Sequence, residues 1–190
     1  FDNTVTGGVA FIGGGARNRA NNSFSTIAGG ENNTTSGDYS TVGGGSRNTA
    51  SGGSAVVAGG SANVASGAQS IIGGGGNNTA SGTISTVVGG SFNGALGPAS
   101  AIGGGAQNTI ALNSPYSTIG AGFGNSVNSS FGLEGFSTIA GGKQNVIDLN
   151  DYGTIGGGVG NRVDGDYGTV PGGSYNHASG YYSFAAGRQR

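Results

Sequence analysis

The sequence predicts an all-β fold, a parallel β-solenoid (β-roll) built from about twelve coils of 15 residues. Three observations predict it. The motif S-T-[IV]-x-G-G-x-x-N recurs along the chain every 15 residues, glycine provides 46 of the 190 residues, and a β-branched residue returns once per period. A repeat this short cannot fold alone, so it must be one turn of a stack. We therefore expect residues 1–190 to form a single solenoid domain.

The first strand of each coil follows the serine of the motif, which we number position one. Position three is Ile or Val in nearly every coil, as in Ile27 and Val42. A column of β-branched residues between small neighbours predicts a strand whose position-three side chains point into the coil. Glycines follow at positions five and six, as in Gly29 and Gly30, and predict a sharp corner because glycine adopts positive φ freely.

Asparagine closes the motif at position nine. Its amide can bond to the same amide one coil away, and the residue tolerates the left-handed conformation. A structural ladder is predicted for Asn18, Asn33, Asn48, Asn63, Asn78, Asn93, Asn108, Asn125, Asn145, Asn161 and Asn176. Position eleven is small and apolar, as in Ala50, and predicts a second strand with this side chain inside. Position thirteen is often glycine, as in Gly52, and predicts a second corner.

The outward residues of the first strand predict association between chains. Position two is mostly Thr, Val or Ile, and position four is nearly always Gly or Ala. A strand of this kind is expected where both faces are covered. The second strand carries Arg19, Arg162 and His177 outward and is expected to face solvent. The simplest interpretation is a homotrimer joined through the first strand, and a monomer with a flat threonine face is the alternative.

Two segments carry a family resemblance. Residues 54–67 read S-A-V-V-A-G-G-S-A-N-V-A-S-G, and residues 178–187 read A-S-G-Y-Y-S-F-A-A-G. They resemble the head repeats of trimeric autotransporter adhesins, S-x-A-x-G-x-x-A-x-A-x-G-x-x, and similar repeats occur in phage tail fibres and bacterial surface proteins. The resemblance implies a left-handed β-roll that assembles as a trimer. The period of 15 departs from the usual 14 of that family, and neither a coiled-coil stalk nor a membrane anchor is present in this chain.

The repeat lengthens to 17, 20 and 16 residues between Ser100 and Gly153, which places inserted loops on one side of the rod within residues 109–152. Inserted loops on one face of a solenoid often bind ligands, although drift in a tolerant corner explains them as simply. An aromatic column precedes the serine of these coils and predicts a stacked ladder or, alternatively, a surface for a sugar. The candidate ligand-binding residues are Tyr116, Phe131, Leu133, Glu134, Phe136 and Tyr152.

Titratable residues are too few to predict catalysis, because the chain has eight carboxylates and one histidine. Asp148 with Asp151 and Asp164 with Asp166 are interpreted as solvated turn residues, and a glycosidase pair is the alternative. The absence of cysteine excludes a thiolate metal site, and the calcium repeat G-G-x-G-x-D fails because Arg162 replaces its aspartate. We expect no enzyme, no metal and no cofactor.

The net charge of −1 gives no reason to expect a nucleic-acid partner, and no apolar run is long enough for membrane insertion. The chain lacks methionine and begins at Phe1, so we expect a processed product or a fragment. We interpret it as a non-catalytic structural segment of an extracellular fibre or adhesin, on a cell surface or a virion. Its expected partners are further copies of itself, as a homotrimer or filament, and a host surface or glycan. An ice-binding or a carbohydrate-binding β-solenoid is the alternative, since regular outward threonines can order water.

Overall fold

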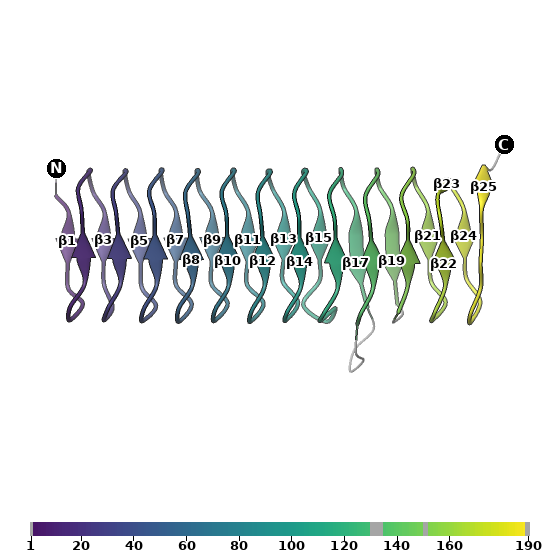
Figure 1. Cartoon of the computed structure of the whole chain (residues 1–190), viewed down its shortest axis with the longest axis horizontal. Coiled ribbons are helices and arrows are strands. Elements are labelled where there is room, and N and C mark those ends of the chain that lie inside the picture. Colours follow the sequence, from purple (N-terminus) through teal and green to yellow (C-terminus); the bar gives the residue numbers. More distant parts are fainter. Residues whose placement is uncertain (1, 130–134, 150–151, 189–190) are drawn as a thin grey trace.

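The protein is a straight all-β rod in which the chain winds through about 11 turns. The computed structural model describes residues 2–129, 135–149 and 152–188, which contain strands and turns and no helix. The N- and C-terminal ends lie at opposite ends of the rod (Figure 1). The predicted parallel β-solenoid is therefore confirmed.

Two parallel sheets run along the rod, and each coil gives one strand to each (Figure 1). Sheet A contains β1 (Thr4–Val5), β3 (Arg19–Ala20), β5 (Thr34–Thr35), β7 (Thr49–Ala50), β9 (Val64–Ala65), β11 (Thr79–Ala80), β13 (Gly94–Ala95), β15 (Thr109–Ile110), β17 (Ser126–Asn128), β19 (Val146–Asp148), β21 (Arg162–Val163) and β24 (His177–Ala178). Sheet B contains β2 (Phe11–Ile12), β4 (Thr26–Ile27), β6 (Thr41–Val42), β8 (Val56–Val57), β10 (Ile71–Ile72), β12 (Thr86–Val87), β14 (Ala101–Ile102), β16 (Thr118–Ile119), β18 (Thr138–Ile139), β20 (Thr154–Ile155) and β22 (Thr169–Val170). A third, two-stranded sheet joins β23 (Gly173–Ser174) to β25 (Gly187–Arg188).

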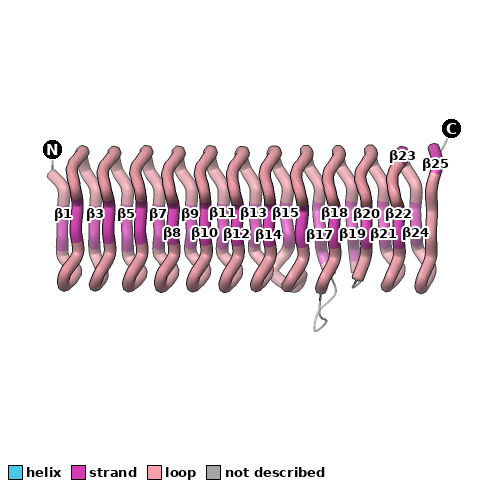
Figure 2. The backbone as a smooth tube through the Cα atoms, viewed as in Figure 1, coloured by secondary structure: helices cyan, strands magenta, loops and turns pink. Residues whose placement is uncertain are grey.

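Every strand pairs with the same position one coil away, so Ile27 lies beside Val42 and Thr35 beside Ala50. A third line of isolated parallel bridges runs through position seven and begins at Ala16 with Glu31. The strands are short and most of the chain forms turns, as Figure 2 shows. The rod is held together mainly by backbone hydrogen bonds from coil to coil.

The core is a narrow file of side chains enclosed between the two sheets. The predicted inward columns are confirmed, because Ile27 and Val42 at position three and Ala50 and Val163 at position eleven are all fully buried. Each coil thus contributes one branched residue from sheet B and one small or branched residue from sheet A. The thinness of the core makes its polar ladders and corners important for stability.

The positive φ predicted for the first corner is confirmed at position six, as in Gly30, whose φ is 89°. Positive φ also falls where the sequence did not predict it, at position eight, as in Arg17, and at position fifteen, as in Phe24. None of the ladder asparagines has positive φ. The residue before the ladder asparagine makes the turn, which leaves the asparagine free to bond along the rod. At the second corner Gly52 has ordinary φ, but a Cβ there would lie 2.0 Å from the carbonyl oxygen of Gly67. Glycine is needed at that corner for close approach of the coils rather than for positive φ.

Candidate functional site

The asparagine ladder links neighbouring coils through side chain and main chain. Asn33 donates its backbone N–H to Oδ1 of Asn18 at 2.9 Å. Its Nδ2 donates to the carbonyls of Gly29 at 3.1 Å and Gly45 at 2.9 Å, which lie in its own and in the next coil. The amide-to-amide bond expected from the sequence appears as an extra contact in some coils, as between Asn108 and its counterpart Asn93 at 3.1 Å. The ladder therefore serves mainly to satisfy backbone groups at the first corner.

The outer face of sheet B, which consists of the residues at positions two and four, carries no charged residue in any coil. Its position-two column is mostly threonine, and exposed apolar side chains interrupt it, among them Phe11 at 59% and Ile71 at 45% exposure. Val88 stands 61% exposed in the position-four column. The charged side chains lie instead at positions seven, eight, ten, twelve and fourteen of the described coils.

The glycines of the position-four column have a cause inside one chain. A Cβ on Gly43 would lie 2.4 Å from the carbonyl oxygen of Ala58, and one on Gly103 would lie 2.2 Å from that of Gly120. Close packing of successive coils thus explains the glycines of this column, whatever covers the face. The absence of charge and the outward Phe, Ile and Val side chains are not explained in this way.

An aromatic ladder runs along the turns that join sheet A to sheet B. The ring centroids lie 4.8 Å apart for Tyr116 and Phe136, 5.6 Å for Phe136 and Tyr152, and 4.8 Å both for Tyr152 with Tyr167 and for Tyr167 with Tyr182. The interplanar angles are 18° or less, so the rings are stacked as the sequence predicted. Because the stacked faces cover one another, a sugar could lie only on an end of the ladder.

The six candidate ligand-binding residues fall into two groups. Tyr116, Phe136 and Tyr152 belong to the aromatic ladder. Phe131, Leu133 and Glu134 lie outside the described residues. The structure therefore brings three of the six together, through ring stacking rather than around a cavity.

A charged network that sequence reasoning missed crosses the C-terminal part of sheet A. The Arg162 guanidinium contacts Oδ2 of Asp148 at 2.8 Å and Oδ1 of Asp164 at 2.7 Å, and Nε2 of His177 lies 2.8 Å from Oδ2 of Asp164. Asn128 donates to Asp148 at 2.9 Å. These residues stand at positions ten and twelve of neighbouring coils, so writing the coils in register would have revealed them.

Arg162 engages both carboxylates of the network. Burial alone would raise the pKa of the Asp164 carboxyl, but hydrogen bonds from Arg162 and His177 hold that pKa below its usual value. The hydrogen bond with Asp164 raises the pKa of Arg162. Both carboxylates of the network are thus engaged by a permanent cation. A general acid needs a proton near neutral pH, so this arrangement favours a structural role.

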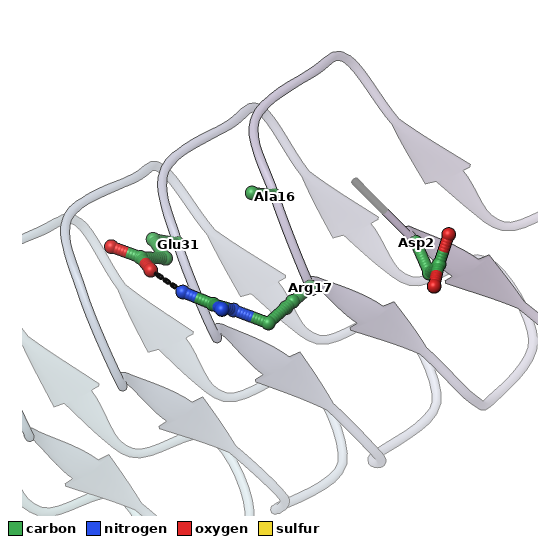
Figure 3. A pocket seen from close by; sticks show the side chains of 4 residues that line it. All are labelled: Asp2, Ala16, Arg17 and Glu31. Atoms are coloured by element: carbon green, nitrogen blue, oxygen red, sulfur yellow. Dashed lines mark hydrogen bonds and ion pairs between the residues drawn. The ribbon is translucent and has the colours of Figure 1, made fainter.

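Two hollows adjoin each other at the N-terminal end of the rod. One, of about 550 Å³, is lined by Asp2, Ala16, Arg17 and Glu31, and Arg17 reaches across it to pair with Glu31 (Figure 3). The other, of about 350 Å³, lies on the outer side of sheet A and shares Asp2 and Arg17. Neither hollow is near the aromatic ladder or the Arg162 network.

No protein-family model matches this chain, and no curated protein matches it either. Within the described residues, no helix is long and apolar enough to cross a membrane, and no three side chains among His, Cys, Asp and Glu gather to hold a metal. Function is therefore inferred from the surfaces of the rod itself.

Proposed function

We propose that the protein is a non-catalytic structural rod that associates with further copies of itself through the outer face of sheet B. The observation that carries this proposal is the segregation of charge. The outer face of sheet B is uncharged in every coil, whereas Arg, Lys, Asp and Glu occupy other columns. Charged residues are depleted at the centres of protein interfaces, so this face has the composition of one.

The length of the face supports the same proposal. Its eleven strands, at a spacing of about 4.8 Å, form one continuous uncharged strip about 50 Å long. The outward Phe11, Ile71 and Val88 side chains would supply its apolar centre.

A second copy is the partner that fits a periodic face. The columns of this face repeat at one interstrand spacing along the rod, and another copy repeats at the same spacing. The resemblance of the repeats to adhesin heads favours three copies and an extracellular or virion location. In that setting the rod would space and display the loops within residues 109–152 to a host surface or glycan.

Two successive coils provide a matched test of association. Thr86 on sheet B and Thr79 on sheet A are both outward, half-buried threonines of neighbouring strands. Thr86→Lys should shift the protein from oligomer to monomer in analytical ultracentrifugation, because it buries a charge in the interface. Thr79→Lys should leave the sedimenting mass unchanged. A wild-type monomer at every concentration would count against the proposal.

Ice binding is the second candidate, favoured by one stretch of sheet B. Thr118, Thr138, Thr154 and Thr169 follow one another on adjacent strands and present a regular line of methyl and hydroxyl groups. Phe11, which stands in the same column and is exposed, breaks the regularity nearer the N-terminus. Thermal hysteresis in the purified protein would support this function, and its absence would dispose of it.

A further inference from the structure

The outward side chains of three N-terminal coils form a patch of two columns on sheet A. The position-eight column contributes Asp2, Arg17 and Asn32, and the position-ten column contributes Thr4, Arg19 and Thr34. These six residues line the hollow of about 350 Å³. Ligand pockets begin at about 300 Å³, so the space suits one small ring or one unit of a chain.

The two arginines of this patch differ in their partners. Arg17 is engaged by Glu31 across the neighbouring hollow (Figure 3). No described residue makes an ion pair or a side-chain hydrogen bond with Arg19. In the other described coils, positions eight and ten together hold at most one cationic side chain. Arg19 is thus a guanidinium without a direct partner among the described residues, in a hollow that also holds the Asp2 carboxylate.

We propose that this hollow binds the carboxylate of an acidic saccharide, with Arg19 as the charged anchor. A guanidinium binds a carboxylate through two parallel hydrogen bonds. The amide of Asn32 and the hydroxyls of Thr4 and Thr34 both donate and accept, which suits the hydroxyls of a sugar ring. Among the described residues, the lining of the hollow is polar or charged throughout, which suits a hydroxylated ligand better than an apolar one.

The site goes beyond the proposed rod function and does not depend on it. It lies on sheet A, whereas association is assigned to the outer face of sheet B, and the two sheets form opposite sides of the rod (Figure 1). Association through sheet B would leave the hollow open. Several copies would then present several weak sites together, which raises the avidity for a polymeric ligand.

Titration of the whole protein with D-glucuronate, D-glucose and acetate tests the proposal, with binding followed by calorimetry and by NMR shifts of the arginine side chains. Glucuronate should bind at least about tenfold more tightly than either glucose or acetate, because only glucuronate offers both the carboxylate and the hydroxyls. Arg19→Gln should weaken glucuronate binding about tenfold or more. Arg19→Lys should weaken it less, since lysine keeps the positive charge but cannot form the two parallel hydrogen bonds of a guanidinium. Arg47→Gln is the matched control, because Arg47 is outward at position eight and does not line the hollow.

Three results would overturn the proposal: no glucuronate binding up to about 10 mM, equal binding of glucose or acetate, or equal losses in Arg19→Gln and Arg47→Gln. Circular dichroism should show that both variants keep the β fold. Sedimentation of Arg19→Gln should match the wild type, so a loss of glucuronate binding can be told apart from a loss of the proposed association.

Discussion

Oδ1 of Asn18 accepts a hydrogen bond from the backbone N–H of Asn33 at 2.9 Å, so a side chain here takes the place of a backbone carbonyl in linking two coils. The same bond recurs along the rod, as from Asn93 N–H to Asn78 Oδ1 at 3.0 Å. Because each asparagine also donates to two carbonyls, a buried corner with several polar groups is left satisfied.

The ladder should be sensitive to a single change in its centre. Asn78→Asp keeps the acceptor but loses the two donated bonds to Gly74 and Gly90 and places a carboxylate in a fully buried position. We expect a loss of about 2–4 kcal/mol in unfolding free energy, measured by denaturant unfolding. Asn77→Asp, at the exposed neighbouring residue, is the control and should change stability by less than about 0.5 kcal/mol.

The aromatic ladder should stabilise the C-terminal half of the rod. Tyr167 stacks on Tyr152 and Tyr182 at 4.8 Å, and each such pair contributes about 0.5–1.5 kcal/mol. Tyr167→Ser should therefore lower the free energy of unfolding by about 1–3 kcal/mol in the same measurement. Tyr175→Ser is a matched control, since Tyr175 has similar φ and is 60% exposed. Equal losses in both variants would show that stacking contributes nothing.

Ile84 should be a site where glycine stabilises the protein. It has φ of 60° and is 56% exposed, which is an unusual combination for a β-branched residue. Ile84→Gly should raise the unfolding free energy by about 1 kcal/mol, because glycine removes the left-handed strain. Ile71→Gly, on an extended strand, should have the opposite sign. Thermal unfolding of both variants measures these changes, and a loss of stability in both would contradict the assignment of backbone strain to Ile84.

The Arg162 network should make stability depend on acidic pH. The folded pKa of Asp164 lies below its unfolded value, so its contribution is present above the unfolded pKa of about 3.9 and is lost as pH falls through the folded value. The stability difference between wild type and Asp164→Asn should therefore shrink as pH falls from about 5 to about 3. In an Arg162→Gln background the same substitution should show much less pH dependence. A difference that is constant with pH in the wild-type background would contradict this linkage.

The coil could be derived from the sequence because its determinants repeat in place. Ile27 and Ala50 were assigned inward from period and residue type alone, and both are buried. The positive φ of the position-six glycines could be derived, but that of positions eight and fifteen could not, because these hold side chains as different as Arg17, Phe24 and Ile84. Residue type does not indicate the φ of these two positions, because backbone pairing between coils imposes their conformation.

The candidate sites were harder to derive than the coil. The hollow beside Arg19 depends on how long side chains fold over the surface, which repeat position does not determine. Arg162 contacts Asp164 two residues further along its own coil and Asp148 in the preceding coil, and only position in register relates the second pair. Sequence reasoning weighed each aspartate against the nearest carboxylate and did not consider Arg162 as its partner.

The left-handed residues have a consequence for how such a rod can change over time. Two columns on its surface hold a fixed backbone conformation with almost any side chain, from Arg17 to Tyr182. Substitutions there leave the inward file and the asparagine ladder untouched. Mutation can therefore alter the chemical character of the surface one coil at a time, while the buried core and the asparagine ladder stay the same.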